Sequence, residues 1–344
     1  VITGLGLADK LLSGLTERGI RFFIYDKTVA NPTVDNIEEA LAVYRANNCS
    51  GIIAFGGGSP LDCAKGVGAR VARPDKSISR LRGVFRVGKS TPPLFAVPTT
   101  AGTGSEATLA AVITDGATHE KYAVSDTRLI PRFAVLDPEL TLNLPKNLTA
   151  ATGMDALTHA VEAYIGGSNT KETRKAAREA VKLIFTNLPV AYSDGQNIDA
   201  RKNMQLAAYY AGVAFTRAYV GYAHAIAHTL GGLYSVPHGL ANAVLLPYVL
   251  EYYGKSVCKR LAELSVLAGA ALPTDDNKTK ALRFIRAIKE LNAAMNIPDK
   301  LSVIREADVG LAAARACREA NPLYPVPRIL NKRDIEALLN AVRA

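Results

Sequence analysis

The sequence predicts an α/β domain with a Rossmann-like parallel sheet, followed by an all-helical domain. Short apolar runs alternate with helical patterns in the first part of the 344-residue chain, and two of these runs end in loops rich in glycine. From Asn147 onward the pattern is helical throughout. The change near Leu142–Pro145 predicts one domain over residues 1–144 and a second over residues 145–344.

The elements of the first domain follow from its apolar runs. Strands are predicted where short apolar stretches are bounded by polar or glycine residues, at 21–25, 50–55, 94–97 and 133–136. Helices are predicted at 34–47 and 61–72. In the second domain, helices are predicted at 149–166, 171–187, 198–217, 221–231, 239–253, 256–269, 276–295, 308–320 and 333–342.

Composition and charge narrow the class of protein. With 49% hydrophobic and 21% charged residues the chain is of ordinary globular composition, and no apolar run reaches the roughly 20 residues of a transmembrane helix. The start VITGLGLADK lacks the pattern of a signal peptide, and the four cysteines are scattered without CxxC spacing. We therefore expect a cytoplasmic protein with reduced thiols.

The net charge of +10 does not by itself indicate a nucleic-acid partner. The basic residues are spread along polar helix faces, as at Lys171, Arg174 and Arg178, without interleaved aromatic residues. We expect neither nucleic acid nor membrane as a partner. The positive field would instead favour an anionic cofactor.

A glycine-rich loop joins the second predicted strand to the helix that follows it. Gly56, Gly57 and Gly58 precede Ser59 and Pro60, and glycines let a backbone approach a diphosphate closely. The helix start behind them offers free N–H groups and the positive end of the helix dipole. By itself this motif is weak evidence for a nucleotide, because it lacks the usual GxGxxG spacing, and a tight strand-to-helix turn is the alternative.

A second loop of small residues follows the third predicted strand. It reads PTTAGTGSE over residues 98–106, and the hydroxyls of Thr99, Thr100 and Thr103 offer hydrogen bonds to an amide, a ribose or a phosphate. Two strand–loop–helix units in one parallel-sheet pattern favour a dinucleotide. The first domain is therefore predicted to be a dinucleotide-binding domain.

The second domain contains four of the five histidines of the chain. Asp155 and His159 are four residues apart in a predicted helix, and His224 and His228 repeat that spacing, which puts each pair on one helix face. His238 follows a predicted helix end. A carboxylate with imidazoles suits Fe²⁺, Zn²⁺, Mn²⁺ or Co²⁺, so a metal site is predicted, with buried hydrogen-bonded histidines as the alternative.

Together these motifs resemble those of the iron-activated, or group III, alcohol dehydrogenase family, over nearly the whole chain. The matching stretches are NPT at 31–33, GGGSPLDCAK at 56–65, PTTAGTGSE at 98–106, DALTHAVEAY at 155–164 and HAIAHTLGGLYSVPHGLANAVLLP at 224–247. The resemblance implies hydride transfer between NAD(P)(H) and a small alcohol, diol or aldehyde, in a cleft between the two domains. It also implies a homodimer or a higher homo-oligomer.

The resemblance also assigns residues. It implies Fe²⁺, with Zn²⁺ or Mn²⁺ as alternatives, bound by Asp155, His159, His224 and His238. His228 matches a histidine beside the nicotinamide and is the expected proton carrier. Residues that match the cofactor lining are Asn31, Gly58, Ser59, Thr99, Thr100, Thr108, Lys121 and Leu140, to which the two loops add Gly57 and Thr103.

One departure concerns the choice between NAD and NADP. The opening strand of the family ends in Thr-Asp, whose carboxylate contacts the ribose, whereas here Thr3 runs directly into Gly4. We expect NAD, with NADP as the alternative, and we expect residues to be missing before Val1 and after Thr3. Asp26 lies elsewhere and does not replace the family's carboxylate.

Two other functions are compatible with these patterns. One is a sister activity on the same scaffold, either a glycerol-type polyol dehydrogenase or a cyclising enzyme similar to dehydroquinate synthase. Three histidines, without an obvious Arg or Lys phosphate clamp beside them, argue against it. The other is a subunit that binds nucleotide without catalysis, against which the complete ligand set argues.

Overall fold

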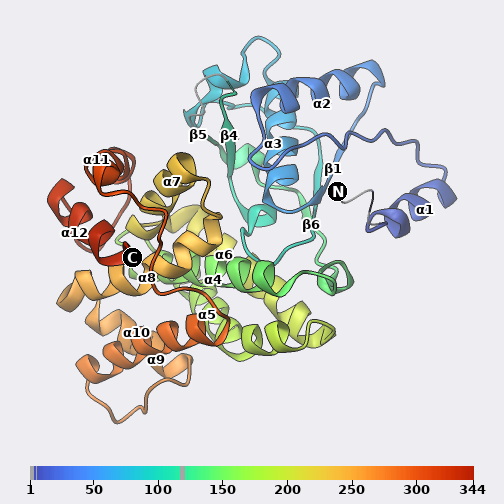
Figure 1. Cartoon of the computed structure of the whole chain (residues 1–344). Coiled ribbons are helices and arrows are strands. Elements are labelled where there is room, and N and C mark those ends of the chain that lie inside the picture. The colour runs from blue at the N-terminus through green and yellow to red at the C-terminus, as the bar shows by residue number, and fades with distance from the viewer. Residues whose placement is uncertain (1–3, 5, 117–120) are drawn as a thin grey trace. The chain divides into compact units, whose positions relative to one another are not determined.

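A computed structural model describes residues 4, 6–116 and 121–344 (Figure 1). The chain divides into two compact units. The first runs to Thr100 and takes in Ser105–Thr141, and the second contains Ala101–Gly104 and Leu142–Ala344. The short segment Ala101–Gly104 thus belongs to the helical unit. The predicted single boundary near residue 144 would have placed this segment in the first domain.

The first unit is built on a parallel sheet in the order β1-β3-β6, formed by β1 (Ile52–Gly56), β3 (Leu94–Pro98) and β6 (Phe133–Ala134). Helix α3 (Gly58–Ala72) packs against β1 and β3, and α2 (Val34–Ala46) packs against α3. On the other sheet face, Phe95 and Phe133 stack with their ring centroids 4.6 Å apart. The parallel sheet and the two helices were predicted, although α3 begins three residues earlier than expected.

A second small sheet has the order β2-β5-β4, with β2 (Gly83–Val84), β4 (Ala110–Thr114) and β5 (Lys121–Ser125). Strands β4 and β5 pair in antiparallel orientation. The sequence analysis missed this sheet, although the Asp115-Gly116 pair that follows β4 is a hairpin turn signal. It also missed α1 (Asp9–Glu17).

The predicted strand at 21–25 is wrong. Its residues are irregular, and among the described residues none forms a β-ladder with this segment. The aromatic and β-branched side chains suggested a strand, but Phe23 and Ile24 are exposed. A strand without a hydrogen-bonded neighbour and without a buried face has nothing to stabilise it.

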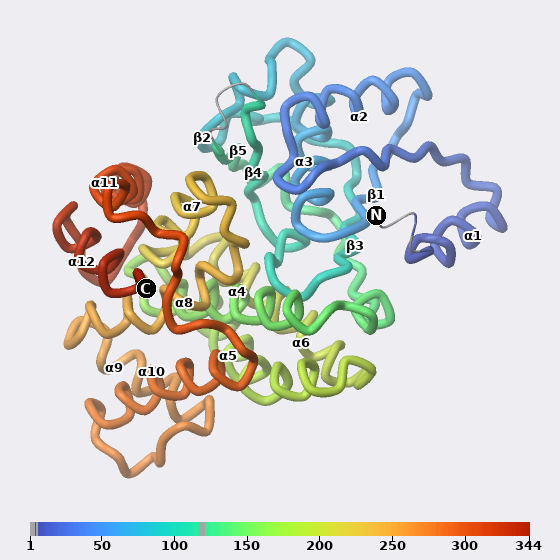
Figure 2. Tube along the Cα trace, in the orientation of Figure 1, coloured from blue at the N-terminus to red at the C-terminus, as the bar shows by residue number. Residues whose placement is uncertain are grey.

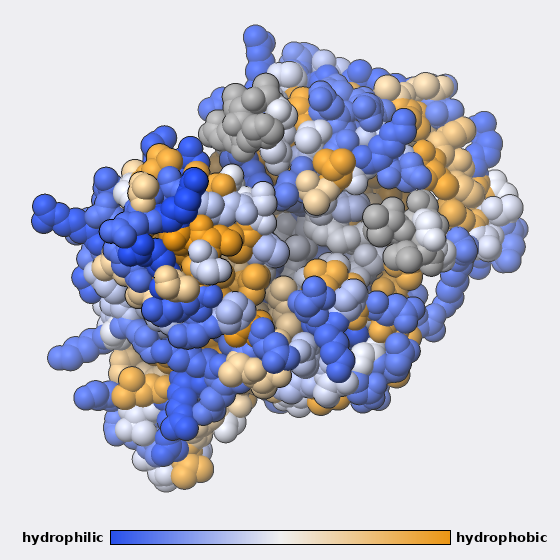
Figure 3. Space-filling view, in the orientation of Figure 1, coloured by the Kyte–Doolittle hydropathy of each residue, from blue (hydrophilic) through white to orange (hydrophobic). Residues whose placement is uncertain are grey.

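The second unit consists of helices, and each helix predicted after residue 145 has a counterpart there (Figure 2). They are α4 (Lys146–Ile165), α5 (Lys171–Ser193), α6 (Ile198–Ala218), α7 (Tyr222–Tyr234), α8 (His238–Tyr253), α9 (Cys258–Leu267), α10 (Asn277–Ala294), α11 (Val309–Ala320) and α12 (Lys332–Val342). Of the described helices, none is long and apolar enough to cross a membrane. Hydrophilic residues are spread over the face seen in Figure 3, with smaller hydrophobic areas between them.

Helix α4 forms the centre of the second unit. It contacts α5, α6 and α8, and its residues from Gly153 to Ile165 are all buried. A helix that is buried on every side needs small side chains to let its neighbours approach, which the Ala-rich sequence provides. Polar side chains on this helix are therefore held in the interior, where each needs a partner.

Candidate metal centre and nucleotide-binding loops

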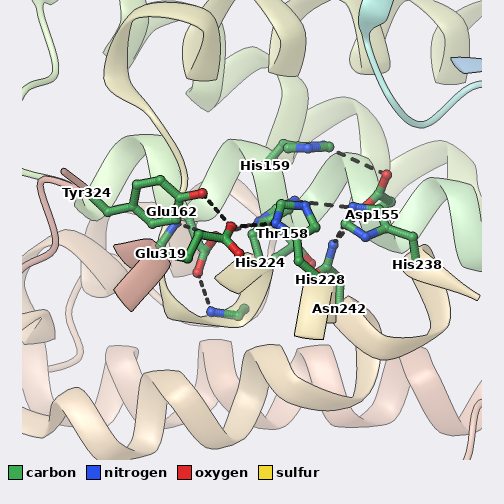
Figure 4. Close-up of polar contacts among 12 residues, drawn as sticks. Asp155, Thr158, His159, Glu162, His224, His228, His238, Asn242, Glu319 and Tyr324 are labelled. Atoms are coloured by element: carbon green, nitrogen blue, oxygen red, sulfur yellow. Dashed lines mark hydrogen bonds and ion pairs between the residues drawn. The ribbon is translucent and has the colours of Figure 1, made fainter. Parts of the chain in front are cut away.

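Four of the predicted site residues come together in the helical unit (Figure 4). Asp155 and His159 lie one turn apart on α4, His224 lies on α7, and His238 is the first residue of α8. One nitrogen or oxygen atom from each lies within 4.8 Å of the corresponding atoms of the others. We call these four residues the His/Asp centre.

Within this centre, Asp155 faces all three imidazoles. Its Oδ1 atom is 3.4 Å from His238 Nε2 and 3.8 Å from His224 Nε2, and its Oδ2 atom is 4.0 Å from His159 Nδ1. These groups face a common point and do not bond strongly to each other. Two ligand atoms that each bind one ion at about 2.1 Å lie about 3.4 Å apart in a tetrahedral arrangement, which is similar to these separations.

A glycine lets the last member of the centre approach the first. Gly239 directly follows His238, and a Cβ atom at this position would lie 2.2 Å from the carbonyl oxygen of Ala151 on α4. Any larger residue would separate the start of α8 from α4. The close approach of these helices therefore brings His238 beside Asp155.

Glu162 is a site residue that the sequence analysis did not single out. It lies one turn after His159 on α4, and its carboxylate accepts hydrogen bonds from His224 Nδ1 at 2.6 Å, Gly221 N at 2.7 Å and Ala223 N at 2.8 Å. Because the carboxylate accepts the hydrogen bond of the Nδ1–H group of His224, the lone pair of that ring is on Nε2, which faces Asp155. The available signal was a glutamate one turn after His159 in an Ala-rich helix.

Burial determines the charge state of these groups. It lowers the pKa of His159 and of His224 well below the usual value, and neighbouring histidines lower both further. Burial also raises the pKa of the Asp155 carboxyl, and raises that of Glu162 to about 7. Neutral imidazoles with available lone pairs are the form of histidine that binds a metal ion.

Two buried nitrogen atoms of the centre test whether a metal ion fits there. His159 Nδ1 and His224 Nε2 are both buried and make no hydrogen bond within the described structure. A buried polar atom without a partner costs about 1 to 3 kcal/mol, so native proteins rarely contain two in one place. A divalent cation would bind both lone pairs and would balance the Asp155 carboxylate, so the residues present fit such an ion.

His228 lies next to this centre but binds a different partner. Its ring stacks on that of His238, with centroids 5.1 Å apart, and its Nδ1 is 2.6 Å from Glu319 Oε1 on α11. His228 therefore has a glutamate at Nδ1, as does His224, although it is not among the four grouped residues. Glu319 was also missed by the sequence analysis.

Three of the predicted cofactor residues are joined in the first unit. The backbone N–H of Asn31 donates to Ser59 Oγ at 3.0 Å, and Lys121 Nζ donates to Asn31 Oδ1 at 2.8 Å. Asn31 has a left-handed backbone with φ of 59°. These contacts bring residues that are far apart in the sequence to the start of α3.

The two predicted loops lie side by side at the ends of β1 and β3. Thr99 N donates to Gly56 O at 2.9 Å, and a Cβ atom at Gly57 would lie 3.4 Å from the Thr100 side chain. Gly57 caps α3 and Gly58 begins it, so the first N–H groups of the helix face this turn. Backbone donors at a helix start next to a bare glycine fit a diphosphate group.

Thr108 faces a different group, the buried ammonium of Lys65. Lys65 Nζ donates to Thr108 Oγ1 at 2.8 Å, Ser105 Oγ at 2.9 Å and the carbonyl oxygen of Ala110 at 2.9 Å. Asp62 accepts from Ser105 Oγ and from the backbone N–H of Val112. We call Lys65, Asp62, Ser105 and Thr108 the Lys65 cluster; it connects α3 to the start of β4.

Two further predicted cofactor residues lie in other segments of the chain. Leu140 is half-buried in the short turn Pro138–Thr141 of the first unit, and Thr103 lies in the segment assigned to the helical unit. Within that segment, Gly104 has a φ of 59°, and a Cβ atom there would lie 2.7 Å from the carbonyl oxygen of Ala208. Thr3, to which the cofactor preference was linked, lies outside the described residues.

Comparisons with known proteins agree along nearly the whole chain. Sequence models described as "Iron-containing alcohol dehydrogenase" and "Fe-containing alcohol dehydrogenase family, C-terminal" match residues 1–138 and 149–343. A 1,3-propanediol dehydrogenase of Klebsiella pneumoniae is 41% identical over 97% of this chain and 86% of its own length. An NAD-dependent methanol dehydrogenase of Bacillus methanolicus is 36% identical over 97% and 88%.

Two solved structures also resemble this chain over nearly its whole length. The crystal structure of a 1,3-propanediol oxidoreductase matches with a TM-score of 0.95 and 40% identity, covering 98% of this chain and 88% of that one. An alcohol dehydrogenase from Oenococcus oeni matches with a TM-score of 0.93 and 38% identity, covering 97% and 88%.

Proposed function

This chain belongs to the iron-containing alcohol dehydrogenase family, and we propose that it oxidises a small primary alcohol or diol, and reduces the corresponding aldehyde, with NAD(H). The single observation that supports this most is the His/Asp centre, with its two buried nitrogen atoms that lack hydrogen bonds. We propose Asp155, His159, His224 and His238 as the ligands of a divalent metal, Fe²⁺ first, with Zn²⁺ or Mn²⁺ as alternatives.

When bound, the metal supplies Lewis acidity that favours loss of the substrate's hydroxyl proton, and the nicotinamide supplies the hydride acceptor. The protein's own residues hold these groups and move the proton. Glu162 fixes the His224 ring with its Nε2 toward Asp155. His228, beside the His/Asp centre and partly exposed, is the group that we assign to proton transfer.

For the cofactor, we propose that Asn31, Ser59 and Lys121 act together with the turn at Gly57 and Gly58. The helix start offers N–H donors to the diphosphate, and Thr99 and Thr100 offer hydroxyls beside it. Thr108 and Leu140 are assigned by resemblance, and Thr103 is assigned from its place in the second loop. The proposal of NAD over NADP draws on the NAD-dependent relative, although an NADPH-dependent butanol dehydrogenase of Clostridium saccharobutylicum is 34% identical.

The proposal also specifies a class of substrate. Relatives that are named for propanediol, methanol and butanol support a short primary alcohol or diol. Oligomeric assembly and a cytoplasmic location stay predictions from the sequence. Light scattering tests the first of these.

A rate panel tests the proposed activity. Purified protein is loaded with Fe²⁺, Zn²⁺ or Mn²⁺ and assayed with 1,3-propanediol, 1-butanol and methanol, and with the aldehydes in reverse, using NAD(H) and NADP(H). We expect metal-dependent turnover, fastest with Fe²⁺ and NAD(H). Turnover that is the same with and without metal, or that no alcohol supports, would contradict the proposal.

A variant of the loop tests the cofactor site separately. Gly58→Val puts a branched side chain at the helix start, so the affinity for NAD should fall while the metal content stays unchanged. Calorimetry with NAD and elemental analysis measure the two quantities on one preparation. Undiminished NAD binding would make the loop a structural turn.

A further inference from the structure

A chain of three polar side chains ends at His228. Tyr324 OH donates to Glu319 Oε1 at 2.7 Å, and the same oxygen atom lies 2.6 Å from His228 Nδ1 (Figure 4). His228 comes from α7 and Glu319 from α11, which pack against each other. The His228 and Glu319 side chains are 30% and 33% exposed, so the pair lies at the edge of the buried interior.

The chemistry of this pair defines where the proton lies on the ring. An ionised carboxylate can only accept hydrogen bonds. Burial opposes ionisation of Glu319, but His228 and the hydrogen bonds from His228 and Tyr324 outweigh it and lower its pKa below the usual value. With Glu319 ionised, the 2.6 Å contact requires the hydrogen on Nδ1 of His228, so whenever the ring is neutral its lone pair lies on Nε2.

Comparison with the neighbouring histidine separates this role from metal binding. His224 and His228 are one turn apart on α7, and each has a glutamate at Nδ1. His224 is 1% exposed and its Nε2 faces Asp155, as expected of a ligand. His228 is partly exposed, and its glutamate comes from a different helix, α11 in place of α4.

We propose that Glu319 is a positioning residue that holds His228 in the Nδ1–H tautomer, so that its Nε2 can accept and return the substrate's proton. Tyr324 fixes the carboxylate by its hydrogen bond to Oε1. This inference rests on the proposed function, because it assumes that His228 moves a proton. It assigns to Glu319 the part that a carboxylate plays in other catalytic histidine pairs, where it orients the ring without itself becoming protonated.

The substitution Glu319→Gln tests the inference most directly. The side chain keeps its shape, but its amide group can donate to Nδ1 and favour the other tautomer. We expect kcat for alcohol oxidation to fall by about 10²-fold or more, with KM for NAD and metal content changed by less than about twofold. Glu319→Gln with wild-type kcat would overturn the inference.

A spectroscopic measurement distinguishes positioning from a merely structural role. With ¹⁵N-histidine in the zinc-loaded protein, five histidines give few signals, and the His228 nitrogen shifts report which nitrogen carries the hydrogen. We expect Nδ1–H in the wild type and Nε2–H in Glu319→Gln. An Nδ1–H signal that persists in the variant would overturn the inference.

Chemical rescue provides a further measurement. Because Glu319 is partly exposed, formate can reach the space left in Glu319→Ala. We expect added formate to restore kcat at least severalfold in this variant, whereas a purely structural loss would not respond. Absence of any response in a folded, metal-loaded variant would argue against a role for the carboxylate.

Matched controls complete the experiment. Glu263 also accepts a hydrogen bond from a tyrosine, Tyr164, but its other charged neighbour is Arg178 and not a histidine, so Glu263→Gln should retain kcat. Tyr324→Phe should lower kcat less than Glu319→Gln does. If His228→Gln keeps full turnover, the proton role in the proposed function fails, whereas the tautomer measurement still decides the inference about Glu319.

Discussion

The Lys65 cluster and the His/Asp centre are both buried and polar, but only one of them satisfies its own hydrogen bonds. Lys65 gives its three N–H groups to three acceptors, and both oxygens of Asp62 accept a hydrogen bond. In the His/Asp centre, His159 Nδ1 and His224 Nε2 make none. The comparison teaches that a saturated buried cluster holds the fold together, whereas a cluster with unpaired lone pairs indicates a ligand.

The largest expected effect is at the His/Asp centre. His224→Ala removes one proposed ligand from the four, so metal content should fall well below about one ion per chain and alcohol oxidation should fall by about 10³-fold or more. Elemental analysis and rate measurements check both. His228→Ala is the matched control, because it removes a neighbouring histidine that we do not assign to the metal and should leave metal content unchanged.

The next effect should appear as lost stability without lost metal. Lys65→Met leaves Asp62 as a buried carboxylate without its cation, so the free energy of unfolding should fall by about 3 to 5 kcal/mol. Denaturant titration measures this quantity. Lys10→Met, which removes an exposed Lys–Glu139 pair, should change little. If Lys65→Met is as stable as the wild type but loses its metal, the contrast between the two clusters is wrong.

The stability of the wild type should depend on pH through Lys65. Burial lowers the pKa of Lys65 to about 8, against 10.5 when unfolded, so the unfolded chain binds more protons at this group between those two values. The wild type should therefore gain up to about 3 kcal/mol relative to Lys65→Met as pH rises from about 8 to 10.5. Glu106, whose pKa burial raises to about 7, titrates below this window. Parallel pH curves for the two proteins would contradict the assignment.

The smallest expected effect concerns the support of a ligand. Glu162→Gln cannot accept all three hydrogen bonds that the carboxylate accepts, so the His224 ring should be held less firmly. Metal affinity should fall by about 10- to 100-fold, the usual cost of losing such a partner. Competition with a chelator measures this affinity. An unchanged affinity would mean that the His224 ring keeps its orientation without the Glu162 carboxylate.

Local sequence patterns predicted the helices and the members of the His/Asp centre. Helical periodicity is a local property, so the spacing of Asp155 and His159 predicted one shared face, and the structure has both on one side of α4. The first glycine loop was likewise visible as a strand end followed by a helix start. The second predicted strand–loop–helix unit is wrong in its last part, because the loop after β3 leads into a short 3-10 turn at Ser105–Ala107 and then into β4. The strand at 21–25 failed because a strand depends on a neighbour, which no local pattern supplies.

The sequence by itself determined which residue types could bind a metal or approach a diphosphate, whereas the tertiary structure decided their partners. Glu319 lies 91 positions from His228, and Ser105 lies 40 positions from Lys65, so no spacing rule connects them. Hydrogen bonds between distant segments depend on how helices and loops pack, down to the single glycine that lets α8 approach α4. The tautomer of each histidine is set by those partners, and for that physical reason only the folded chain shows how the rings of His224 and His228 are held.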